Sequence, residues 1–351
     1  MPKTELAGLP LAKLTKLLSS YPAYRSVQIY QWLIRGVGAF DEMRNLPIHL
    51  RRELDAQYNL ISGRVCSELS GKDGSVKLGI ELEDGAVIES VILQDKKHRK
   101  TACLSTQAGC PLGCVFCKTG KIGFKRNLTA LEIAGQFLHL KKRQSEISHI
   151  VIMGMGEPLL NLEELRKAHD FFTEKDGLNI SKKRITLSTC GIKKGILELA
   201  GEGPDIRLAI SLTTAREELR RRLMPAGSQT PLPRLKEALL EYQRKRKRRI
   251  TLEMVLLCGI NTGIEDADAA ADFASGLEAV FNLIPWNPVD GLEFKGRPLQ
   301  TPSSKETAAF VSALESRGLK VTLRIEKGRQ ISGACGQLGA IDSQEVQENP
   351  D

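Results

Sequence analysis

Apolar residues near the start of the chain recur at the spacing of an α-helix. A run of leucines over residues 11–18 and a second apolar set over residues 29–34 each fall on one face of a helix with 3.6 residues per turn. This pattern is typical of helices that bury one side against a neighbour. We therefore expect residues 1–60 to form a helical accessory domain.

The period of the pattern then changes from that of a helix to that of a strand. Apolar and polar positions alternate over residues 75–82 and again over residues 86–93, and Glu83, Asp84 and Gly85 lie between the two runs. Two alternating runs around a short polar turn predict a β-hairpin. We place this hairpin in an extension that covers residues 61–98.

From residue 99 onward, strand-like and helical patterns alternate along the chain. The predicted strands are residues 101–106, 149–153, 184–188, 206–212, 250–257, 279–284 and 320–325. The predicted helices between them include residues 131–140, 162–172, 232–242 and 305–314. Repeated units of this kind predict a parallel sheet with helices outside it.

The number of units limits the kind of fold. About six βα units are too few for a complete eight-stranded barrel. We predict an α/β fold, an open, partial (βα)6 TIM-like barrel over residues 99–340, followed by an acidic tail at residues 341–351. A doubly wound sheet is the alternative, although no Gly-x-Gly-x-x-Gly segment supports dinucleotide binding.

Composition adds a bias toward an anionic partner. The 351 residues carry a formal net charge of +9, which favours a polyanion without requiring one. No apolar run is long enough to span a bilayer, and the N-terminus lacks the pattern of a signal peptide. We therefore expect a cytoplasmic protein with no membrane partner. In that compartment, eight cysteines indicate metal or redox chemistry rather than a disulfide scaffold.

Three of these cysteines lie together after the first predicted barrel strand. Cys110, Cys114 and Cys117 have C-x3-C-x2-C spacing, and Gly109 and Gly113 allow the backbone to bend around a common centre. Three thiolates can hold a four-iron, four-sulfur (4Fe–4S) cluster and leave one iron open to a substrate. Structural zinc is the alternative, but no His or Cys follows within twenty residues to supply a fourth ligand.

Small and polar residues follow the other predicted barrel strands. Because strand ends share one rim of a barrel, these residues are candidates for binding a cofactor. They are Gly156, Glu157, Ser188, Ser211, Leu212, Thr213 and Asn287. Taken singly, most of them are also ordinary residues of a strand-to-helix turn. Their joint position on one rim favours a binding site.

Longer segments resemble a known family, the radical S-adenosylmethionine RNA methyltransferases of the RlmN type (the RlmN/Cfr family). The matching segments are Cys103–Cys110, Gly123–Leu128, Met153–Leu159, Asn282–Pro288 and Ala334–Leu338, together with Gln28–Leu33 and Met43–Pro47 in the N-terminal part. They cover almost the whole chain. Thr213 is a departure, because the family usually has His at that position.

The resemblance implies a reaction and a role for particular residues. It implies methylation of adenine C2 in large-subunit ribosomal RNA, with tRNA beside the anticodon left open as a second substrate. Two S-adenosylmethionine molecules serve each turnover: one methylates Cys335, and the other is cleaved at the cluster to activate that methyl group. Cys103 then forms a disulfide with Cys335, and Glu89 accepts the C2 proton. The partners implied are an external electron donor such as flavodoxin and no second subunit.

Other readings of these residues remain open. The sister subfamily methylates C8 of the same adenine, and a non-catalytic iron–sulfur RNA-binding module would need neither Cys103 nor Cys335. Glu89 could be a solvated charge on an edge strand. The remaining cysteines, Cys66, Cys190 and Cys258, are expected to be small buried apolar residues.

Runs of basic residues are candidates for contacts with RNA phosphates. They are Lys96–Lys100, Arg220–Arg222 and Arg244–Arg249. Cations in such runs neutralise phosphates and make binding sensitive to salt. The alternative is a solvated helix end, where positive charge is favoured by the helix dipole.

Overall fold

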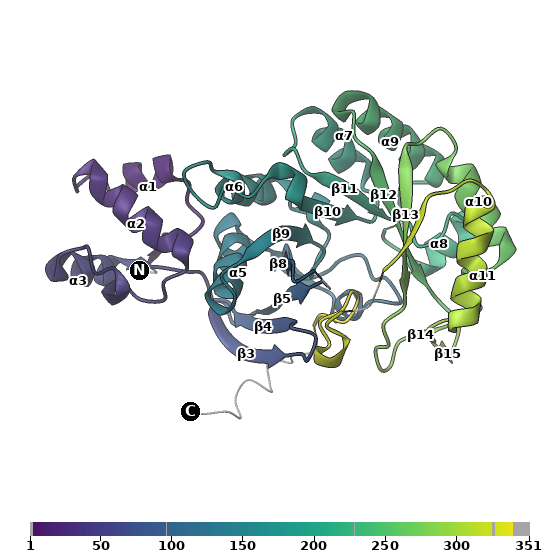
Figure 1. Cartoon of the computed structure of the whole chain (residues 1–351), viewed down its shortest axis with the longest axis horizontal. Helices are drawn as coiled ribbons and strands as arrows, with labels where there is room; N and C mark the ends of the chain where they lie inside the picture. Colours follow the sequence, from purple (N-terminus) through teal and green to yellow (C-terminus); the bar gives the residue numbers. More distant parts are fainter. Residues whose placement is uncertain (1–2, 96, 228, 325–326, 340–351) are drawn as a thin grey trace.

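The N-terminal helices form a lobe at one side of the molecule. In the computed structural model, which describes residues 3–95, 97–227, 229–324 and 327–339, this lobe contains α1 (Leu11–Leu17), α2 (Ala23–Arg35) and α3 (Ile48–Gln57) (Figure 1). Strands β1 (Thr4–Glu5) and β2 (Tyr58–Asn59) pair in parallel and bring the two ends of the lobe together. The acidic tail at residues 341–351 lies outside the described residues.

One carboxylate joins this lobe to the rest of the protein. The backbone N–H of Leu11, at the start of α1, donates to Oε1 of Glu174 at 3.1 Å. The hydroxyl of Tyr30 on α2 donates to the same carboxylate. Because the first N–H groups of a helix have no partner within it, Glu174 satisfies one of them and also favours the helix dipole.

A single ten-stranded sheet forms the body of the protein. In spatial order its strands are β16 (Val321–Leu323), β13 (Ala279–Pro285), β12 (Ile250–Leu256), β11 (Arg207–Ser211), β10 (Ile185–Thr189), β9 (Ile147–Ile152), β6 (Lys100–Cys103), β5 (Val87–Gln94), β4 (Val76–Glu81) and β3 (Arg64–Ser70). From β16 to β6 all neighbours are parallel. The last three strands are antiparallel, and β5 pairs with β6.

Helices connect the parallel strands and cover the outside of the sheet. The six connecting helices are α5 (Ala130–Arg143), α6 (Leu162–Thr173), α7 (Lys193–Gly201), α9 (Leu232–Arg246), α10 (Ile264–Ala274) and α11 (Ser304–Glu315). Six βα units and a final strand confirm the predicted α/β partial barrel. All seven predicted barrel strands are present, with ends that differ by a few residues.

Shorter elements occupy the loops. They are α4 (Lys118–Ile122), α8 (Glu217–Leu223), the strand pairs β7 (Gln107–Gly109) with β8 (Phe124–Asn127) and β14 (Glu293–Phe294) with β15 (Arg297–Pro298), and the 3-10 turns η1 (Phe40–Glu42), η2 (Pro158–Leu160), η3 (Lys182–Arg184) and η4 (Arg329–Ile331). Among the described helices, none is long and apolar enough to cross a membrane.

The hairpin is part of the barrel sheet rather than an appendage. Strands β4 and β5 match the two alternating runs in the sequence. The sequence did not predict β3, because its residues, RVCSELS, form a half-exposed edge strand with no strong alternation of apolar positions. Pairing of β5 with β6 makes the sheet continuous across residue 99.

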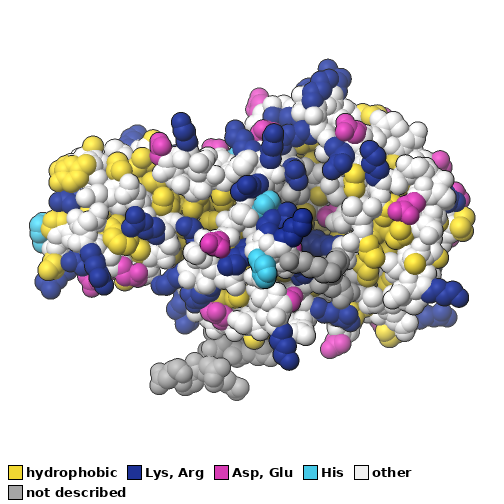
Figure 2. All heavy atoms as spheres, in the orientation of Figure 1, with side chains coloured by type: hydrophobic (Ala, Val, Ile, Leu, Met, Phe, Trp, Pro, Cys, Tyr) yellow, Lys and Arg dark blue, Asp and Glu magenta, His cyan; other side chains and the backbone are white. Residues whose placement is uncertain are grey.

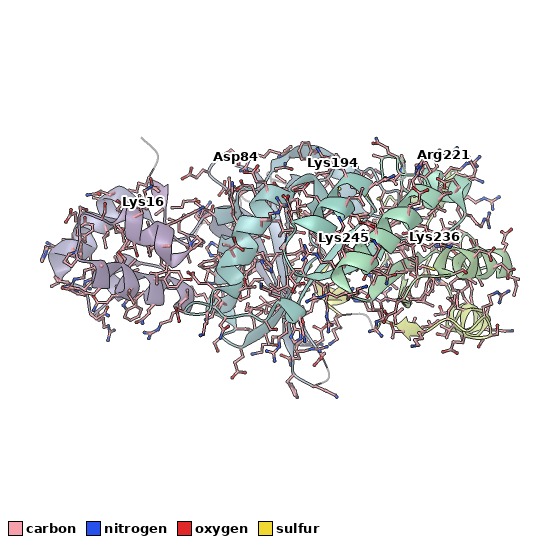
Figure 3. The ribbon with its side chains drawn as sticks, turned by 90° about the horizontal axis from the view of Figure 1, so that it is seen from above. Lys16, Asp84, Lys194, Arg221, Lys236 and Lys245 are labelled. Atoms are coloured by element: carbon pink, nitrogen blue, oxygen red, sulfur yellow. The ribbon has the colours of Figure 1, made fainter. Side chains whose placement is uncertain are left out.

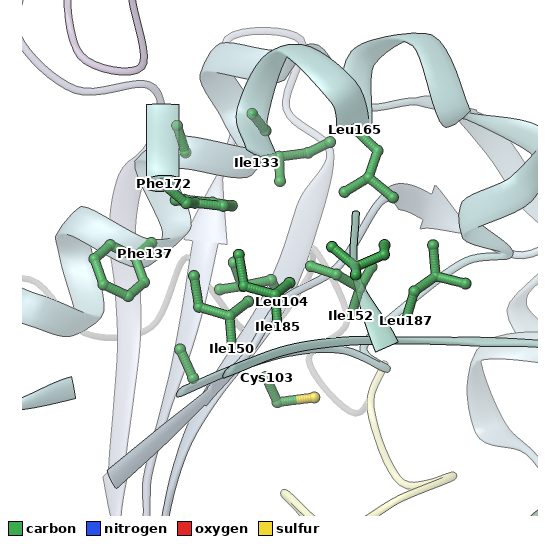
Figure 4. Close-up of a cluster of buried hydrophobic side chains, with 14 of the residues drawn as sticks. Cys103, Leu104, Ile133, Phe137, Ile150, Ile152, Leu165, Phe172, Ile185 and Leu187 are labelled. Carbon is green, nitrogen blue, oxygen red and sulfur yellow. The ribbon is translucent and has the colours of Figure 1, made fainter. Parts of the chain in front are cut away.

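The main core lies between the sheet and its helices. Leu104, Ile150 and Ile185 pack there against Phe172 of α6 (Figure 4). Burying each such side chain contributes about 1.5 to 3 kcal/mol. The sulfur of Cys103 points away from this layer, toward the inside of the barrel (Figure 4).

After β16 the chain crosses back over the open side of the barrel. The C-terminal segment (residues 327–339) runs from the β16 edge to the hairpin (Figure 1, yellow). There the backbone N–H of Gly328 donates to Oδ2 of Asp73 at 2.9 Å, and Nζ of Lys77 donates to the carbonyl of Ser332 at 3.4 Å. The segment therefore bridges the two sides of the incomplete barrel.

Replacing Glu174 by Ala should loosen the N-terminal lobe. The change removes the acceptor for both Leu11 and Tyr30, so we expect a loss of about 2 kcal/mol in the free energy of unfolding, measured by urea denaturation. Glu163→Ala is the control, because its carboxylate is exposed and, among the described residues, pairs with Lys167 on the surface of α6; it should change stability by less than about 0.5 kcal/mol. Equal effects of the two changes would contradict this role for Glu174.

Candidate active site

The three-cysteine loop is framed by the short β7–β8 ribbon. The N–H of Cys110 donates to the carbonyl of Gly123 at 2.7 Å, which closes the base of the loop. Gly109 has a positive φ of 81°, and a Cβ atom there would lie 1.9 Å from that same carbonyl oxygen. Only glycine fits this close approach.

The thiols of Cys110, Cys114 and Cys117 line one cavity inside the barrel, which we call the cofactor cavity. Burial raises the pKa of Cys110 to about 12 and also raises the pKa of Cys114 and Cys117. Nearby thiols raise the pKa of each further, so the three sulfurs lie close enough to influence one another. A cationic cluster would stabilise all three as thiolates.

The arrangement of these thiols suits a cluster of several metal ions. In a 4Fe–4S cube each thiolate binds a different iron, so the sulfurs are spread apart. A structural zinc site instead needs its ligands gathered around one ion. Over the described part of the chain, no three His, Cys, Asp or Glu side chains are placed to hold a single metal ion. The described residues therefore give the zinc alternative no support, while three thiolates from one loop match the number of protein ligands expected for a cluster with one open iron.

Most of the predicted cofactor-binding residues line the same cavity. They are Gly156, Glu157, Ser188, Ser211 and Asn287, from the ends of β9, β10, β11 and β13. Met153, Trp286 and Cys335 complete part of its wall. These residues therefore lie together at the carboxyl ends of the parallel strands, as the sequence predicts.

Glu157 lies in the wall of this cavity with its carboxylate held by backbone donors. Its Oε1 accepts from the N–H of Leu159 at 3.0 Å, and its Oε2 accepts from the N–H of Cys190 at 2.8 Å. Burial raises the pKa of Glu157, while these bonds oppose the rise. Gly156 packs against Gln107, whose Cβ would lie 2.6 Å from an added Cβ. The carboxylate is therefore fixed in place and suited to accept hydrogen bonds from a ligand amine.

Asn287 has an unused acceptor in the cofactor cavity. Its Nδ2 donates to the carbonyl of Cys335 at 3.0 Å. Its Oδ1 is buried, and no described residue donates to it. Because a buried amide oxygen without a donor is costly, this atom fits a ligand that supplies one.

Leu212 and Thr213 are placed differently from the other predicted residues. Both side chains are fully buried, and neither lines the cofactor cavity. Thr213 has a positive φ of 58°, and its backbone N–H donates to the carbonyl of Glu253 at 3.0 Å. Its hydroxyl has no partner among the described residues. Their predicted part in cofactor binding remains a prediction.

Glu253 is a residue that the sequence reasoning missed. Its carboxylate accepts from the hydroxyl of Ser188 at 2.6 Å and from Nδ2 of Asn282 at 3.2 Å. It lies on β12 inside the barrel, 7% exposed, and faces the cofactor cavity. The signal was present, since a single carboxylate in the apolar strand ITLEMVL is costly to bury without a function.

Cys335 lies beside the cluster loop. The carbonyl of the next residue, Gly336, accepts from the N–H of Lys118 at 2.8 Å. Burial, together with the nearby Cys335 thiol, raises the pKa of Cys103 to about 12. All eight cysteines are free thiols, so the disulfide implied between Cys103 and Cys335 is not formed in this state.

Glu89 is not the solvated edge charge that the sequence left open. It lies on β5, between β4 and β6, and is 1% exposed. Val91 is opposite Cys103 in the pairing of β5 with β6, so Glu89, two residues away on β5, faces the same side as Cys103. Its Oε1 lies 3.0 Å from Nζ of Lys77. The alternative is therefore wrong, and Glu89 faces inward.

A second, larger cavity opens at the amino ends of the strands. This basic cavity has a volume of about 640 Å³ and is lined on one side by Lys97, Arg99, Arg324 and Lys327. It shares Met153 and Glu253 with the cofactor cavity. Dark blue Lys and Arg side chains gather around the middle of the face shown in Figure 2.

Cys335 connects the two cavities. It lines the cofactor cavity on one side. On the other side it lines a gap of about 20 Å³ together with Arg324 and Lys327, which also line the basic cavity. A group carried on its sulfur is thus placed between the cluster loop and the basic cavity.

The other basic runs are mostly engaged in local contacts. Arg220 is fully buried, and its guanidinium donates to the carbonyl of Cys190, so its prediction as an RNA contact is wrong. Arg221 and Arg222 pair with Glu218. Arg244 and Lys245 pair with Glu241, and Arg246 and Arg248 contact the neighbouring loop. Arg221 and Lys245 lie on the outer helices (Figure 3).

The three isolated cysteines differ in their burial. Cys190 is buried, as expected, and lines the cofactor cavity, whereas Cys66 and Cys258 are only half-buried, so their prediction as buried residues is wrong. Cys66 is on the edge strand β3, where one face stays open to water. Lys96, the first residue of one basic run, lies outside the described residues.

Comparisons with known proteins agree with this geometry. Residues 104–274 match the model of the radical SAM superfamily. The probable dual-specificity RNA methyltransferase RlmN of Treponema denticola is 48% identical over 338 residues, 96% of each chain. That of Thermus thermophilus is 42% identical over 320 residues, 90% of this chain and 88% of the relative. The crystal structure of a radical SAM methyltransferase from Sphaerobacter thermophilus has a TM-score of 0.90 at 36% identity, over 96% of this chain and 99% of that one.

A partial barrel with a three-cysteine loop after its first strand defines the class of radical S-adenosylmethionine enzymes. Within this class, the chain belongs to the RlmN family of RNA methyltransferases. The cofactors are a 4Fe–4S cluster and S-adenosylmethionine, of which each turnover uses two molecules.

Replacing Cys114 by Ser should remove the cluster. The hydroxyl is a poor ligand for iron, so the anaerobically reconstituted variant should lose the brown colour and most of the roughly four irons expected for the wild type. Iron analysis and the visible spectrum measure both. Cys258→Ser is the control, because Cys258 is distant from the loop in sequence and does not line the cofactor cavity. A wild-type protein that binds one zinc and no iron would contradict the assignment.

Proposed function

We propose that this protein methylates C2 of an adenine in large-subunit ribosomal RNA, with tRNA beside the anticodon as a second substrate. The observation that carries the proposal is the position of Cys335 between the cofactor cavity and the basic cavity. A methyl group received on its sulfur from one side would be presented to RNA on the other. The relatives' name, dual-specificity RNA methyltransferase, supports an RNA substrate with two targets.

The basic cavity provides a suitable entry for RNA. Phosphates favour Lys and Arg side chains, and four of these residues line the cavity. Enzymes that modify a base take it out of the stack into a pocket. An adenine that entered here would approach Cys335 and the inward face of β5 and β6.

The bound cofactors would supply the methyl group and the one-electron chemistry that adenine C2 requires, since its C–H bond is not acidic. The protein's own residues would do the rest. Cys335 would carry the methyl carbon, and Glu89 would accept the C2 proton. The Cys103 thiolate would then attack the Cys335 sulfur, so that an S–S bond forms, the S–C bond breaks with its electrons going to carbon, and that carbon takes up a proton.

Further partners follow from this chemistry. Reductive cleavage needs an external electron donor such as flavodoxin, and reducing the Cys103–Cys335 disulfide for the next turnover needs a thiol or another reductant. We propose that the protein acts as a monomer.

Mass spectrometry of adenosine from treated RNA tests the proposed function. Ribosomal RNA and tRNA from cells that lack this enzyme should gain 2-methyladenosine when incubated with the protein, S-adenosylmethionine and a reductant. 8-Methyladenosine would instead indicate the sister activity. No methylated adenosine in either RNA would contradict the proposal.

Variants of the two cysteines give the control for this experiment. Cys335→Ala should bind the cluster but never bond to RNA. Cys103→Ala should accumulate a protein–RNA conjugate that survives denaturation and disappears with ribonuclease, because the carbon that joins sulfur to C2 cannot leave. Normal turnover by Cys103→Ala would show that its assigned role is wrong.

Neutralising the basic cavity should make RNA binding less sensitive to salt. Changing Lys97, Arg99 and Lys327 together to Gln should reduce the slope of log affinity against log salt by about 2 to 3 units, since each phosphate contact contributes about 0.7 to 0.9. A triple Gln variant of Arg221, Arg222 and Arg244, which lie on the outer helices and do not line the basic cavity, is the matched control. Equal slopes for the two variants would place RNA elsewhere.

A further inference from the structure

A buried ion pair lies under the segment that carries Cys335. Lys77 on β4 and Glu89 on β5 are each 1% exposed, and Nζ lies 3.0 Å from Oε1. Removing two charges from water is expensive, and such a pair often stabilises a protein no more than apolar residues of similar size. Stability alone therefore does not explain why both charges are buried here.

The pair holds the C-terminal segment (residues 327–339) at one point on either side of Cys335. Nζ of Lys77 donates to the carbonyl of Ser332 at 3.4 Å. Oε2 of Glu89 accepts from the N–H of Gly339 at 2.6 Å. Ser332 precedes Cys335 by three residues, and Gly339 follows it by four. The two charges thus fix the backbone on either side of the cysteine.

In this arrangement a nucleotide cannot reach the carboxylate of Glu89. The carboxylate is almost fully buried, one oxygen is paired with Lys77, and the other is covered by the N–H of Gly339. Glu89 lines neither the cofactor cavity nor the basic cavity. For Oε2 to accept a proton from a nucleotide, the Gly339 end of the segment must first move away. Lys77 contacts the other oxygen and can stay.

We propose that Lys77 is a positioning residue for Glu89 and for the Cys335 segment. Before RNA enters, Lys77 and Glu89 together hold the segment against β4 and β5. When the Gly339 end moves away, Lys77 keeps the carboxylate oriented through its contact with Oε1, and Oε2 is free to accept the proton. The second part rests on the proposed function, in which Glu89 accepts the C2 proton; the first part does not.

Lys77→Met tests both parts, because it keeps the aliphatic stem and removes the ammonium group. With saturating ribosomal RNA, release of methylated RNA should fall about tenfold or more, as expected when a proton acceptor is misplaced, with the KM for RNA within about threefold. Methylation of Cys335, read as a mass increase of the protein, should stay within about twofold. A protein–RNA conjugate should accumulate although Cys103 is intact, since the C2 proton leaves too slowly.

The contact between Lys77 and the C-terminal segment is tested in the absence of RNA. Alkylation of Cys335 by iodoacetamide, followed by mass spectrometry of its peptide, should be about tenfold faster in Lys77→Met than in the wild type, because a charge-assisted contact to the segment is lost. Arg64→Met on β3 is the control: its pair with Glu81 is at the surface, with Arg64 71% exposed. It should match the wild type in every measurement.

A second variant covers the case in which Lys77→Met folds poorly. Removing both charges in Lys77→Met/Glu89→Gln avoids a lone buried charge, so this protein should regain stability. It should still alkylate rapidly at Cys335 and still accumulate the conjugate. Wild-type alkylation and turnover in a folded Lys77 variant would overturn the proposal, as would a loss of Cys335 methylation as large as the loss of product release. If no adenine is methylated by the wild type, the proposed function fails, while the alkylation result still decides whether Lys77 holds the segment.

Discussion

The open side of the barrel is the constraint on which the site depends. Seven parallel strands do not close a barrel, so the inward face between β16 and the hairpin needs another cover. The C-terminal segment supplies it by crossing to β4 and β5, where its backbone bonds to Asp73, Lys77 and Glu89. Cys335 lines the cofactor cavity and the small gap beside the basic cavity because this segment crosses between them.

The two ends of the strands provide different surroundings. At the carboxyl ends, buried thiols and a fixed carboxylate, Glu157, form a confined site with few free charges. At the amino ends, cations line a wide and accessible cavity. Glu253 and Met153 lie at the boundary, so a change at either residue acts on both sites. A reaction that takes a methyl group from a small molecule to a polyanion needs both kinds of surroundings.

Burial also lowers the reactivity of the Cys103 thiol. A thiol with a pKa of about 12, as for Cys103, is neutral at neutral pH and a weak nucleophile. The thiolate forms more readily as the surroundings become more polar. Two free thiols form a disulfide only when an oxidant takes up two electrons, so Cys103 and Cys335 can lie near each other as free thiols. In the proposed motion of the C-terminal segment, the Glu89 carboxylate, which the N–H of Gly339 now covers, would become available.

The sequence by itself determined the repeating βα units, the hairpin and the cysteine loop, because each depends on local periodicity or on ligands a few residues apart. It also placed Gly156, Ser211 and Asn287 on one rim, since parallel strands end on the same side. Only the tertiary structure decided that β5 joins the barrel, that Glu89 is paired with Lys77, and that Arg220 is buried. These contacts join residues that are distant in sequence, and a single charged residue carries no local signal of whether its partner is water or another buried charge.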